Sequence, residues 1–480
     1  MIVLQHFYID GDWQQPDGTE TMPILTPSTG AQVGLVRLGN ARDVDRAVAA
    51  AQQAFATYSM LPKPARLALL RRLAEVMRRR MDELARAITT EMGAPITLSR
   101  AEQAASGLGH LEAFIATLAA HQEEETLPNG DIVSHEPIGV CGLITPWNWP
   151  INQIALKVIP ALAAGCTCVL KPSEHTPLSA RLFAEMIHEA GFAPGVFNLV
   201  FGDGPSVGAA LSQHPDVAMM SFTGSTRAGS AVSRDAAATI KRVALELGGK
   251  SPNVIFADAD LEARVAEGVR ACFDNTGQSC NAPTRMLIER SAYDRALEIA
   301  RATASEQAVG DPHQEGDHIG PLFDRLQYDR VQRMIRTGLD EGTPLLIGGP
   351  GRPEGLAPEL AQGWFARPTI FYDVTPQMTL WREEVFGPVL VMTPFDSESE
   401  AIALANDTIY GLDAYISTGD AARALRMARA LRAGGIHING RGTDYGSPFG
   451  GFKQSGNGRE GGRFGFEDYL EVKVRPPFAP

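Results

Sequence analysis

Apolar residues recur at helical spacing near the start of the chain. Between residues 42 and 92, two stripes with three- and four-residue spacing predict two amphipathic helices. The first stripe is Val44, Val48, Ala51 and Phe55, and the second is Leu67, Leu70, Leu73, Met77, Met81 and Leu84. Both stripes are expected to face a hydrophobic core.

From Gly139 onward, short apolar runs alternate with longer helical patterns, which predicts βαβ units and a parallel sheet covered on both faces. The predicted order is strand 139–145, helix to 164, strand 167–171, helix 177–190, strand 197–201, helix 205–212, strand 217–222 and helix 227–236. Thr176, which precedes Pro177, is expected to cap the second of these helices. A second α/β series is expected from Leu261 to Gly440.

Two further segments predict exposed β structure. Asn129 and Gly130 separate two short extended runs, which is a hairpin signal, and this hairpin should project from a compact body. The C-terminal stretch 466–474 ends in strand-like alternation. We expect it to add an edge strand to another subunit.

Composition narrows the class of protein. The chain has 480 residues, 44% of them hydrophobic, so it can fill several cores. A formal charge of −13 disfavours nucleic acid and anionic membranes as partners. The N-terminus lacks a basic region and a secretory apolar run, and no later run of about 18 apolar residues predicts a membrane span. Five cysteines without a CxxC pair fit a reduced, cytoplasmic compartment.

Candidate catalytic groups follow predicted strands and turns. Cys280 lies in FDNTGQSC (residues 273–280), and a cysteine on a turn is a better nucleophile than one inside a strand. Asn148 in PWNWP (146–150) offers an amide that could hold an oxyanion. Glu246 ends an apolar run before two glycines, where partial burial would raise its pKa toward general-base duty. Taken singly, Glu246 is more often a structural charge and PWNWP more often an aromatic-rich turn.

Two predicted strand ends also suggest a nucleotide. Lys171 and Glu174 in KPSE (171–174) could bind ribose hydroxyls, and Glu174 would oppose a 2′-phosphate, so NAD is favoured over NADP. Residues 221–229 open a helix whose amides could face a pyrophosphate. The glycine-rich stretch 202–208 has one residue too many for GxGxxG, and a plain loop stays equally open. No metal is expected, because His313 and His318 belong to an acidic surface loop.

In combination these motifs resemble the aldehyde dehydrogenase superfamily, in its non-acylating, bacterial-type form, from about Phe7 to the C-terminal strand. The resemblance assigns Cys280 as nucleophile, Glu246 as base and Asn148 as oxyanion donor. It also adds EEVFGP (383–388), in which Glu384 would contact the nicotinamide ribose and Phe386 the nicotinamide ring. The residues expected to contact NAD are Ile144, Thr145, Pro146, Trp147, Lys171, Ser173, Glu174, Gly204, Pro205, Gly208, Phe222, Thr223, Gly224, Ser225, Leu247, Gly248, Glu384 and Phe386.

The resemblance further implies an α/β fold with a Rossmann-like cofactor domain, an α/β catalytic domain and a small β oligomerisation hairpin. The expected boundaries are 1–123 with 139–248 for the cofactor domain, 249–448 for the catalytic domain, and 124–138 with 462–480 for the oligomerisation segment. A homodimer or homotetramer is implied.

The expected reaction is oxidation of a small aldehyde to a carboxylic acid through a thiohemiacetal and a thioester on Cys280. By position, the substrate tunnel is expected to include Trp149, Gln153, Leu156, Arg441, Thr443 and Tyr445. Arg441 would pair with a carboxylate if the substrate were a semialdehyde, although an exposed loop arginine is the commoner case. The motifs also leave room for a CoA-acylating dehydrogenase, which Glu246 disfavours, and for a cysteine hydrolase or esterase, which would need no nucleotide.

Overall fold

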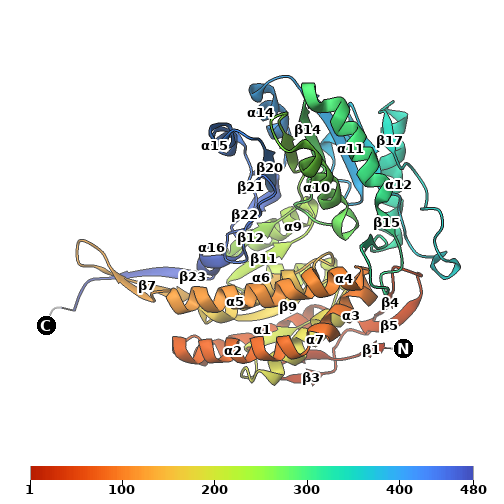
Figure 1. Ribbon diagram of the computed structural model, residues 1–480. Coiled ribbons are helices and arrows are strands. Elements are labelled where there is room, and N and C mark those ends of the chain that lie inside the picture. Colours follow the sequence, from red (N-terminus) through yellow and green to blue (C-terminus); the bar gives the residue numbers. More distant parts are fainter. Residues whose placement is uncertain (1, 479–480) are drawn as a thin grey trace.

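The computed structural model describes residues 2–478 of the chain. Within these residues it contains two large β-sheets, of eight and seven strands, and three small ones. The two large sheets lie in the lower and upper parts of the molecule in Figure 1, and a small sheet projects from one side. The small sheets near the N-terminus and beside the upper body are β1 (Ile2–Leu4), β5 (Gln32–Arg37) and β4 (Thr21–Leu25), and β15 (Ala308–Val309) with β16 (His318–Ile319).

The eight-stranded sheet contains the predicted βαβ series. Its strands, in spatial order, are β22 (Gly456–Asn457), β12 (Arg242–Glu246), β11 (Met219–Thr223), β8 (Val140–Ile144), β9 (Thr167–Lys171), β10 (Phe197–Leu199), β2 (Phe7–Ile9) and β3 (Asp12–Gln14). The five from β12 to β10 run parallel, which confirms the predicted parallel sheet. β22, β2 and β3 are antiparallel additions at its two edges.

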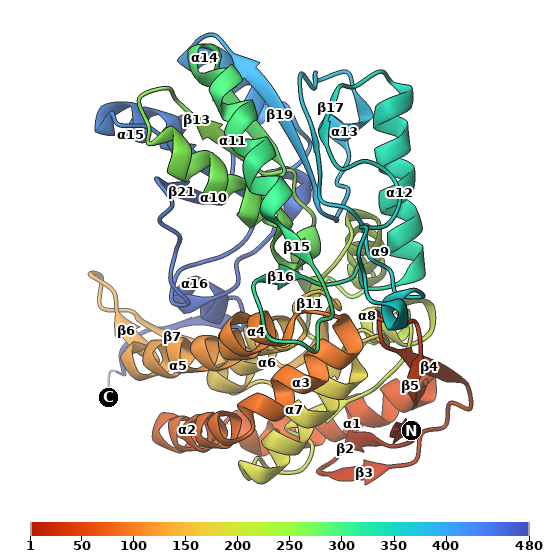
Figure 2. The ribbon, with the colours of Figure 1, turned by 45° about the vertical axis from the view of Figure 1, so that its right-hand side comes forward.

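Helices from the N-terminal half and the βαβ crossovers cover this sheet (Figure 2). They are α1 (Ala41–Tyr58), α2 (Lys63–Arg79), α3 (Met81–Met92), α4 (Ile96–Leu98), η1 (Ser99–Gln103), α5 (Ala104–Ala120), α6 (Pro150–Ala164), α7 (Pro177–Glu189), η2 (Gly204–Gly208), α8 (Ala209–Gln213) and α9 (Thr226–Ala237). The expectation of two helices over residues 42–92 was wrong. There are three, because Arg80 leaves the helical region (φ −107°, ψ 14°) and separates α2 from α3.

Two predicted helix starts differ in detail from those in the structure. Helix 205–212 begins with the π-helical turn η2 before α8 follows. Thr176 is the N-cap of α7, but its side chain makes no capping hydrogen bond. The buried carboxylate of Glu91 on α3 instead accepts hydrogen bonds from the Leu178 and Ser179 main-chain N–H groups, at 2.6 and 3.0 Å. A distant side chain therefore caps this helix.

The seven-stranded sheet is formed by the second α/β series. Its strands, in spatial order, are β17 (Leu345–Ile347), β18 (Thr369–Phe371), β19 (Val389–Phe395), β14 (Arg285–Glu289), β13 (Pro252–Ile255), β20 (Asp413–Ser417) and β21 (Gly435–Ile438). Its helices are α10 (Leu261–Phe273), η3 (Asp274–Gly277), η4 (Arg290–Ala292), α11 (Tyr293–Glu306), α12 (Arg325–Asp340), η5 (Pro358–Leu360), α13 (Thr379–Arg382), α14 (Glu398–Asn406) and α15 (Ala421–Ala430). Successive residues Val254 and Ile255 belong to different hydrophobic clusters, so both faces of the sheet are covered.

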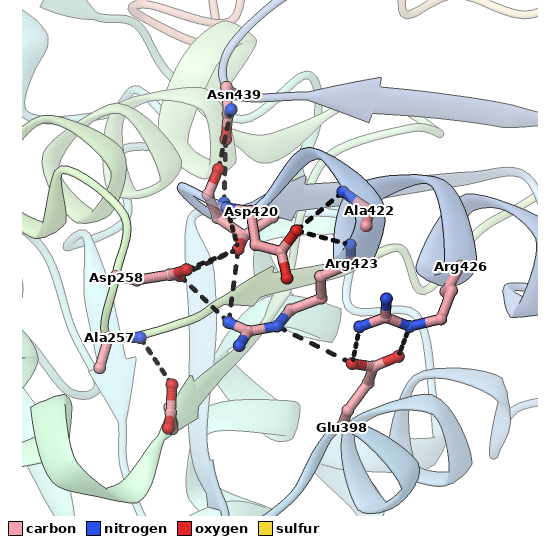
Figure 3. A network of polar contacts seen from close by, with 10 residues as sticks. Ala257, Asp258, Glu398, Asp420, Ala422, Arg423, Arg426 and Asn439 are labelled. Atoms are coloured by element: carbon pink, nitrogen blue, oxygen red, sulfur yellow. Dashed lines mark hydrogen bonds and ion pairs between the residues drawn. The ribbon is translucent and has the colours of Figure 1, made fainter.

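A network of ion pairs and hydrogen bonds between side chains links the ends of this sheet to its helices (Figure 3). Arg423 on α15 pairs with Asp258, which follows β13, at 3.2 Å and lies over the Phe256 ring at 4.4 Å. Glu398 on α14 accepts two hydrogen bonds from Arg426, at 2.9 and 2.8 Å. These contacts fix α14 and α15 beside the strand ends.

The predicted hairpin is formed by β6 (Glu124–Thr126) and β7 (Ile132–Pro137), and it projects from the body (Figure 1). The expectation that the C-terminal strand adds an edge strand to another subunit stays a prediction, because β23 (Leu470–Arg475) forms the outer edge of this small sheet. β23 pairs antiparallel with β7 of the same chain. Arg242 fixes its start by donating to the Asp468 and Leu470 carbonyl oxygens at 2.6 and 2.8 Å.

The remaining elements lie between β21 and β23. They are η6 (Lys453–Ser455), the edge strand β22 and α16 (Gly462–Glu467). This part of the chain crosses from the seven-stranded to the eight-stranded sheet. Among residues 2–478, no helix combines the length and the apolar character that crossing a bilayer requires.

Candidate active site

The carboxyl ends of the parallel strands in the eight-stranded sheet gather most of the predicted polar residues at one edge. Ile144 at the end of β8 pairs with Lys171 at the end of β9, and Thr223 at the end of β11 pairs with Glu246 at the end of β12. The chain moves from β8 to β9 and β10 on one side, then returns to place β11 on the other side of β8. The carboxyl ends of β8 and β11 therefore form a topological switch point, and open α/β sheets bind ligands in the crevice outside such a point.

Cys280 follows a strained turn between α10 and the second sheet. Asn275 and Thr276 both adopt left-handed backbone conformations, with φ of 48° and 59°. Gly277 has φ of 69°, and a Cβ there would collide with the Gly387 carbonyl, so only glycine fits. Cys280 itself is half-buried. The close backbone packing presents its thiol at the junction of the two sheets.

Close packing at two glycines, Gly249 and Gly450, places the segment that carries Glu246 against Cys280. A Cβ at Gly249 would collide with the Cys280 carbonyl oxygen, and a Cβ at Gly450 would collide with a Glu246 carboxylate oxygen. Neither oxygen of the buried Glu246 carboxylate has a hydrogen-bond partner within the described residues. An unpaired buried carboxylate is costly, which marks this position as functional rather than structural.

Burial shifts the pKa values of both groups upward. Burial first, and then the carboxylates of Glu384, Glu246 and Asp413, raise the pKa of the Cys280 thiol. Burial and the neighbouring Glu460 raise the pKa of Glu246 well above its usual value, and Lys157 offsets part of this increase. The resting site therefore holds a protonated thiol beside a carboxyl group with high proton affinity.

Lys157 and Glu460 form a buried ion pair next to Glu246 that sequence reasoning did not identify. Lys157 also donates to the Thr223 hydroxyl at 2.7 Å, and one Glu460 carboxylate oxygen has no partner within the described residues. A signal for Lys157 was present: it is the one charged residue in the otherwise apolar or amide-bearing helix 150–164. The sequence contained no comparable signal for Glu460, because the segment that carries it follows no predicted element.

The PWNWP turn places Asn148 against the Cys280 turn. The buried Asn148 amide donates to the Gln278 carbonyl oxygen at 2.9 Å, and the Trp149 indole donates to the Ser279 hydroxyl at 2.9 Å. Asn148, Glu246 and Cys280, predicted from separate motifs, thus converge on one junction. This arrangement has the nucleophile, base and amide donor that covalent acyl chemistry requires.

The switch-point crevice carries the predicted nucleotide-binding motifs. Lys171 Nζ donates to the Gly202 carbonyl oxygen at 2.7 Å and lies 3.2 Å from Glu174 Oε2. Ser225 caps α9, whose N-terminal amides face the crevice mouth after β11. Ser173 and Thr145 are buried in the loops after β9 and β8, and Gly204, Pro205 and Gly208 form η2, beside Ile144 and Lys171.

Other predicted contacts border the same crevice from the second sheet. Glu384 Oε1 accepts a hydrogen bond from Gly249 N at 3.0 Å, and a Cβ at Gly248 would collide with its carboxylate. The Phe386 ring lies edge-on to Trp147, with centroids 5.6 Å apart. Phe222 and Leu247 are buried at the strand ends, and Gly224 follows β11 in the turn that leads into α9. Pro146 belongs to the same loop as Trp147.

A cavity of about 830 Å³ opens beside the Cys280 turn. Its walls include Trp149, Ser279, Asn281 and Tyr415, and the acidic residues Glu102 and Asp274. Burial and Glu102 raise the pKa of Asp274 to about 6. Sequence reasoning missed Glu102 and Asp274, although Asp274 lies within the FDNTGQSC motif.

Of the six predicted tunnel residues, Trp149 lines this cavity and the other five do not. Gln153 and Leu156 are buried within α6. Arg441, Thr443 and Tyr445 belong to an exposed loop after β21, and the Tyr445 ring contacts His110 on α5 at 4.9 Å between centroids. Among residues 2–478, no group of three His, Cys, Asp or Glu side chains is placed to hold a metal ion.

Comparison with known proteins identifies close relatives over nearly the whole chain. 3-Succinoylsemialdehyde-pyridine dehydrogenase of a Pseudomonas species is 53% identical over 471 residues, which are 98% of each chain. Aldehyde dehydrogenase C of Pseudomonas syringae, solved with NAD⁺ and octanal, is 48% identical, with a TM-score of 0.97 and coverage of 99% of this chain and 97% of that one.

A second solved structure, an aldehyde dehydrogenase from Bartonella henselae, is 48% identical and superposes with a TM-score of 0.97 over 99% of both chains. Residues 13–475 match the family model described as the aldehyde dehydrogenase family. The arrangement of thiol, carboxylate and amide at the switch-point crevice, and these matches over the full fold, establish that this chain is an enzyme of the aldehyde dehydrogenase family.

Proposed function

We propose that this enzyme oxidises an aldehyde to a carboxylic acid with NAD, through covalent intermediates on Cys280. The observation that carries the proposal is the convergence of Cys280, Glu246 and Asn148 at the junction between the dinucleotide-type crevice and the 830 Å³ cavity. The crevice supplies a place for a nucleotide and the cavity a place for an aldehyde. Cys280 lies between Ser279 and Asn281, which line the cavity.

The donor set of the crevice fits NAD. The α9 N-terminus and Ser225 would hold the pyrophosphate, because amide N–H groups and the helix dipole favour anions there. Lys171 and Glu174 would hold the adenosine ribose, and the Glu174 carboxylate would repel a 2′-phosphate. Glu384 and Phe386 would contact the nicotinamide ribose and ring. When bound, NAD supplies the acceptor for the hydride that leaves the substrate carbon.

The first covalent step belongs to Cys280. Its sulfur forms a bond to the aldehyde carbon while the thiol proton passes to Glu246, whose carboxylate oxygens are free of other partners within the described residues. The carbonyl electrons move to oxygen, which gains negative charge. The Asn148 amide and the Cys280 main-chain N–H stabilise that charge in the resulting thiohemiacetal.

After oxidation the acyl group remains on Cys280 as a thioester. The proton that Glu246 took from the thiol first passes to solvent. Glu246 then takes a proton from water, the hydroxyl oxygen attacks the thioester carbon, and the C–S bond breaks to release the acid. The departing thiolate takes the proton back from Glu246 and becomes the thiol again. Repulsion from Glu460 raises the proton affinity of Glu246, so taking a proton from water relieves a buried like-charge contact. Lys157 forms an ion pair with Glu460 beside it.

The cavity walls favour neutral or cationic aldehydes. Arg441, which would recognise a carboxylate, does not line the cavity. Among residues 2–478, its lining has one arginine, Arg270, and five acidic residues, which are Glu102, Glu267, Asp274, Glu306 and Asp317. The 53% identical relative is named for a semialdehyde, so a semialdehyde is the second candidate substrate. The excess of acidic over basic side chains in the lining disfavours a semialdehyde whose other end carries a negative charge.

We also propose the domain roles and the assembly that the sequence predicts. Residues 1–123 and 139–248, which include every strand of the eight-stranded sheet except β22, would bind the cofactor, and 249–448 would carry the nucleophile. The sheet of β6, β7 and β23 would join subunits in a homodimer or homotetramer, because β23 is an edge strand with exposed Val472 and Val474. A cytoplasmic location remains the expectation from the free, reduced cysteines.

Reduction of NAD by purified enzyme tests the reaction. With a panel of aliphatic and aromatic aldehydes, we expect an absorbance increase at the wavelength of reduced nicotinamide. The rate should be at least about a thousandfold lower for Cys280→Ala, because the nucleophile is gone. Cys272→Ala is the matched control, since Cys272 is a buried cysteine of α10. It should retain turnover.

The same assay separates the three reaction classes. Turnover without CoA contradicts a CoA-acylating enzyme, and hydrolysis of esters with no NAD reduction would support a cysteine hydrolase. NAD reduction by Cys280→Ala at the wild-type rate would exclude the covalent mechanism.

A further inference from the structure

The π-helical turn η1 lies directly behind the candidate oxyanion donor. It interrupts the helical path between α4 and α5, and π-helical turns occur frequently at functional sites. Its last residue, Gln103, is fully buried. Neither the sequence motifs nor the proposed chemistry assign Gln103 a role.

Gln103 connects the two segments that carry Asn148 and Cys280. Its Nε2 donates to the Asn148 main-chain oxygen at 3.0 Å and to the Asn275 side-chain oxygen at 3.3 Å. The orientation of its amide is fixed by chemistry, because the Asn148 main-chain oxygen can only accept a hydrogen bond. The Gln103 side-chain oxygen is buried without a partner in the described part of the chain, so the residue satisfies Asn148 and Asn275 at its own cost.

The same amides form a closed set around the Cys280 turn. Asn275 Nδ2 donates to the Asn148 main-chain oxygen at 3.1 Å and to the Gln278 main-chain oxygen at 3.3 Å. Asn148 Nδ2 donates to that same Gln278 oxygen at 2.9 Å. A primary amide has two N–H groups. One N–H of Asn148 is therefore held by Gln278, and the other remains for an oxyanion.

The backbone of this turn needs such support. Asn275 and the β-branched Thr276 are held in left-handed conformations that cost energy for residues other than glycine. Strained conformations persist only when surrounding contacts determine them. Gln103 contributes to that support from outside the turn, and it does so through an atom that also holds the Asn148 segment.

We propose that Gln103 is a positioning residue that couples the oxyanion donor Asn148 to the Cys280 turn, so that amide and thiol keep one relative geometry. The inference rests on the proposed function, because aldehyde oxidation on Cys280 is the reaction whose oxyanion Asn148 would stabilise. It assigns Gln103 no contact with substrate or cofactor. Its effect passes through Asn148 and belongs to the chemical step rather than to binding.

A double-mutant cycle tests this coupling. Gln103→Met keeps the length and removes the donor, and we expect kcat for aldehyde oxidation to fall about ten- to a hundredfold with KM for NAD unchanged. Asn148→Ala should lose about a hundred- to a thousandfold. The variant with both changes should be no slower than Asn148→Ala alone, because Gln103 acts through Asn148. A product of the two losses would overturn the proposal, as would a wild-type kcat in Gln103→Met.

Two controls separate positioning from damage to the fold. Ser99→Ala removes a buried hydrogen bond from the same π-helical turn, between Ser99 and Thr89 at 2.9 Å, and should leave kcat unchanged. Alkylation of Cys280 by iodoacetamide needs no oxyanion donor, so its rate should be unchanged in Gln103→Met. A matching loss of alkylation rate would show a general disturbance of the turn and overturn the proposal.

Gln103→Asn provides a second variant that keeps a buried amide but shortens its reach. It should also lower kcat, and full activity would contradict the role. If the wild-type enzyme reduced no NAD with any aldehyde, the proposed function itself would fail and this inference with it. If the wild-type enzyme oxidised aldehydes and the two fold-losses in kcat multiplied in the double variant, only the positioning role of Gln103 would be rejected.

Discussion

Asp274 is the residue at which the substrate cavity meets the Cys280 turn. It begins the strained turn that leads to Cys280 and also lines the cavity with Glu102. Burial and Glu102 raise its pKa to about 6, so near neutral pH the carboxylate is largely ionised but remains sensitive to pH. A charge in this wall should discriminate between substrates by the charge at their far end.

Asp274→Asn tests this discrimination. We expect the wild-type enzyme to have a higher kcat/KM for betaine aldehyde than for 3,3-dimethylbutanal, which has the same shape without charge. The substitution should reduce this ratio about two- to tenfold, or on the order of 1 kcal/mol, because the carboxylate is partly solvated. Above about pH 6 the ionised carboxylate attracts the cation, so the wild-type preference should grow as pH rises through this value.

Asp294→Asn is the matched control for net charge, since Asp294 is exposed on α11. It should leave the preference unchanged. An equal ratio in the wild-type enzyme and Asp274→Asn would show that the acidic wall does not select the substrate.

Residues in the candidate site differ in how visible they were in the sequence. Cys280 and Glu246 have local signals, a turn and a strand end, and the structure brings both to one junction. Their catalytic roles stay predictions until tested. Glu460 and Gln103 have no local signal, because each acts on a partner more than forty positions away.

At the scale of single elements, α7 shows how a helix start can depend on a distant residue. Glu91 on α3 accepts from two main-chain N–H groups of α7 and from the Ser179 hydroxyl. Burial raises the pKa of Glu91 to about 8, against the opposing effect of these hydrogen bonds. The folded protein therefore holds a proton on Glu91 that the unfolded chain loses at about pH 4.5.

The free energy of unfolding should depend on pH because of this shift in the pKa of Glu91. Because the folded pKa lies above the unfolded one, the contribution of Glu91 is full below about pH 4.5 and is lost as pH rises toward about 8. The loss should not exceed about 1.4 kcal/mol per pH unit. Glu91→Gln cannot ionise, so its melting temperature should change less between about pH 5 and about pH 8.

Glu189→Gln changes an exposed glutamate at the C-terminal end of α7 and is the control. Its melting temperature should keep the wild-type pH dependence. Parallel melting curves for the wild-type protein and Glu91→Gln across this range would contradict the linkage.

At the scale of the whole molecule, the sheet of β6, β7 and β23 extends away from the two large sheets (Figure 1). Val472 and Val474 lie two positions apart on β23, on the same face, and are 67% and 62% exposed. Ion pairs of Lys473 with Glu136 and of Arg475 with Glu124 hold the strand to the hairpin. An exposed apolar row on an edge strand is typical of an association surface.

Val472→Lys combined with Val474→Lys tests the proposed assembly. Buried valines contribute about 1.5–3 kcal/mol each, so association should weaken at least about tenfold. Light scattering after size exclusion should then show a smaller species than the wild-type protein forms. Val3→Lys changes an exposed valine on β1 and should leave the mass unchanged. Identical masses for the wild-type protein and the double variant would locate any interface elsewhere.

Sequence patterns predicted an element correctly where the residues that determine it are neighbours in the chain. The four strands predicted between residues 139 and 222 correspond to β8, β9, β10 and β11, because apolar runs and glycine boundaries mark buried strands directly. The break between α2 and α3 was not predicted, since Arg80 is compatible with a helix and only packing takes it out of helical geometry.

The sequence by itself determined the α/β class, the parallel sheet, and the turn and strand ends that carry Cys280, Glu246 and Asn148. These depend on hydrophobic spacing and on backbone preferences of glycine and proline, which act over a few residues. Tertiary structure alone decided that Gln103 holds Asn148, that Lys157 and Glu460 surround Glu246, and that Asp274 rather than Arg441 faces the cavity. Those contacts join segments far apart in the chain, and only the packed fold brings their side chains within hydrogen-bonding or Coulombic range.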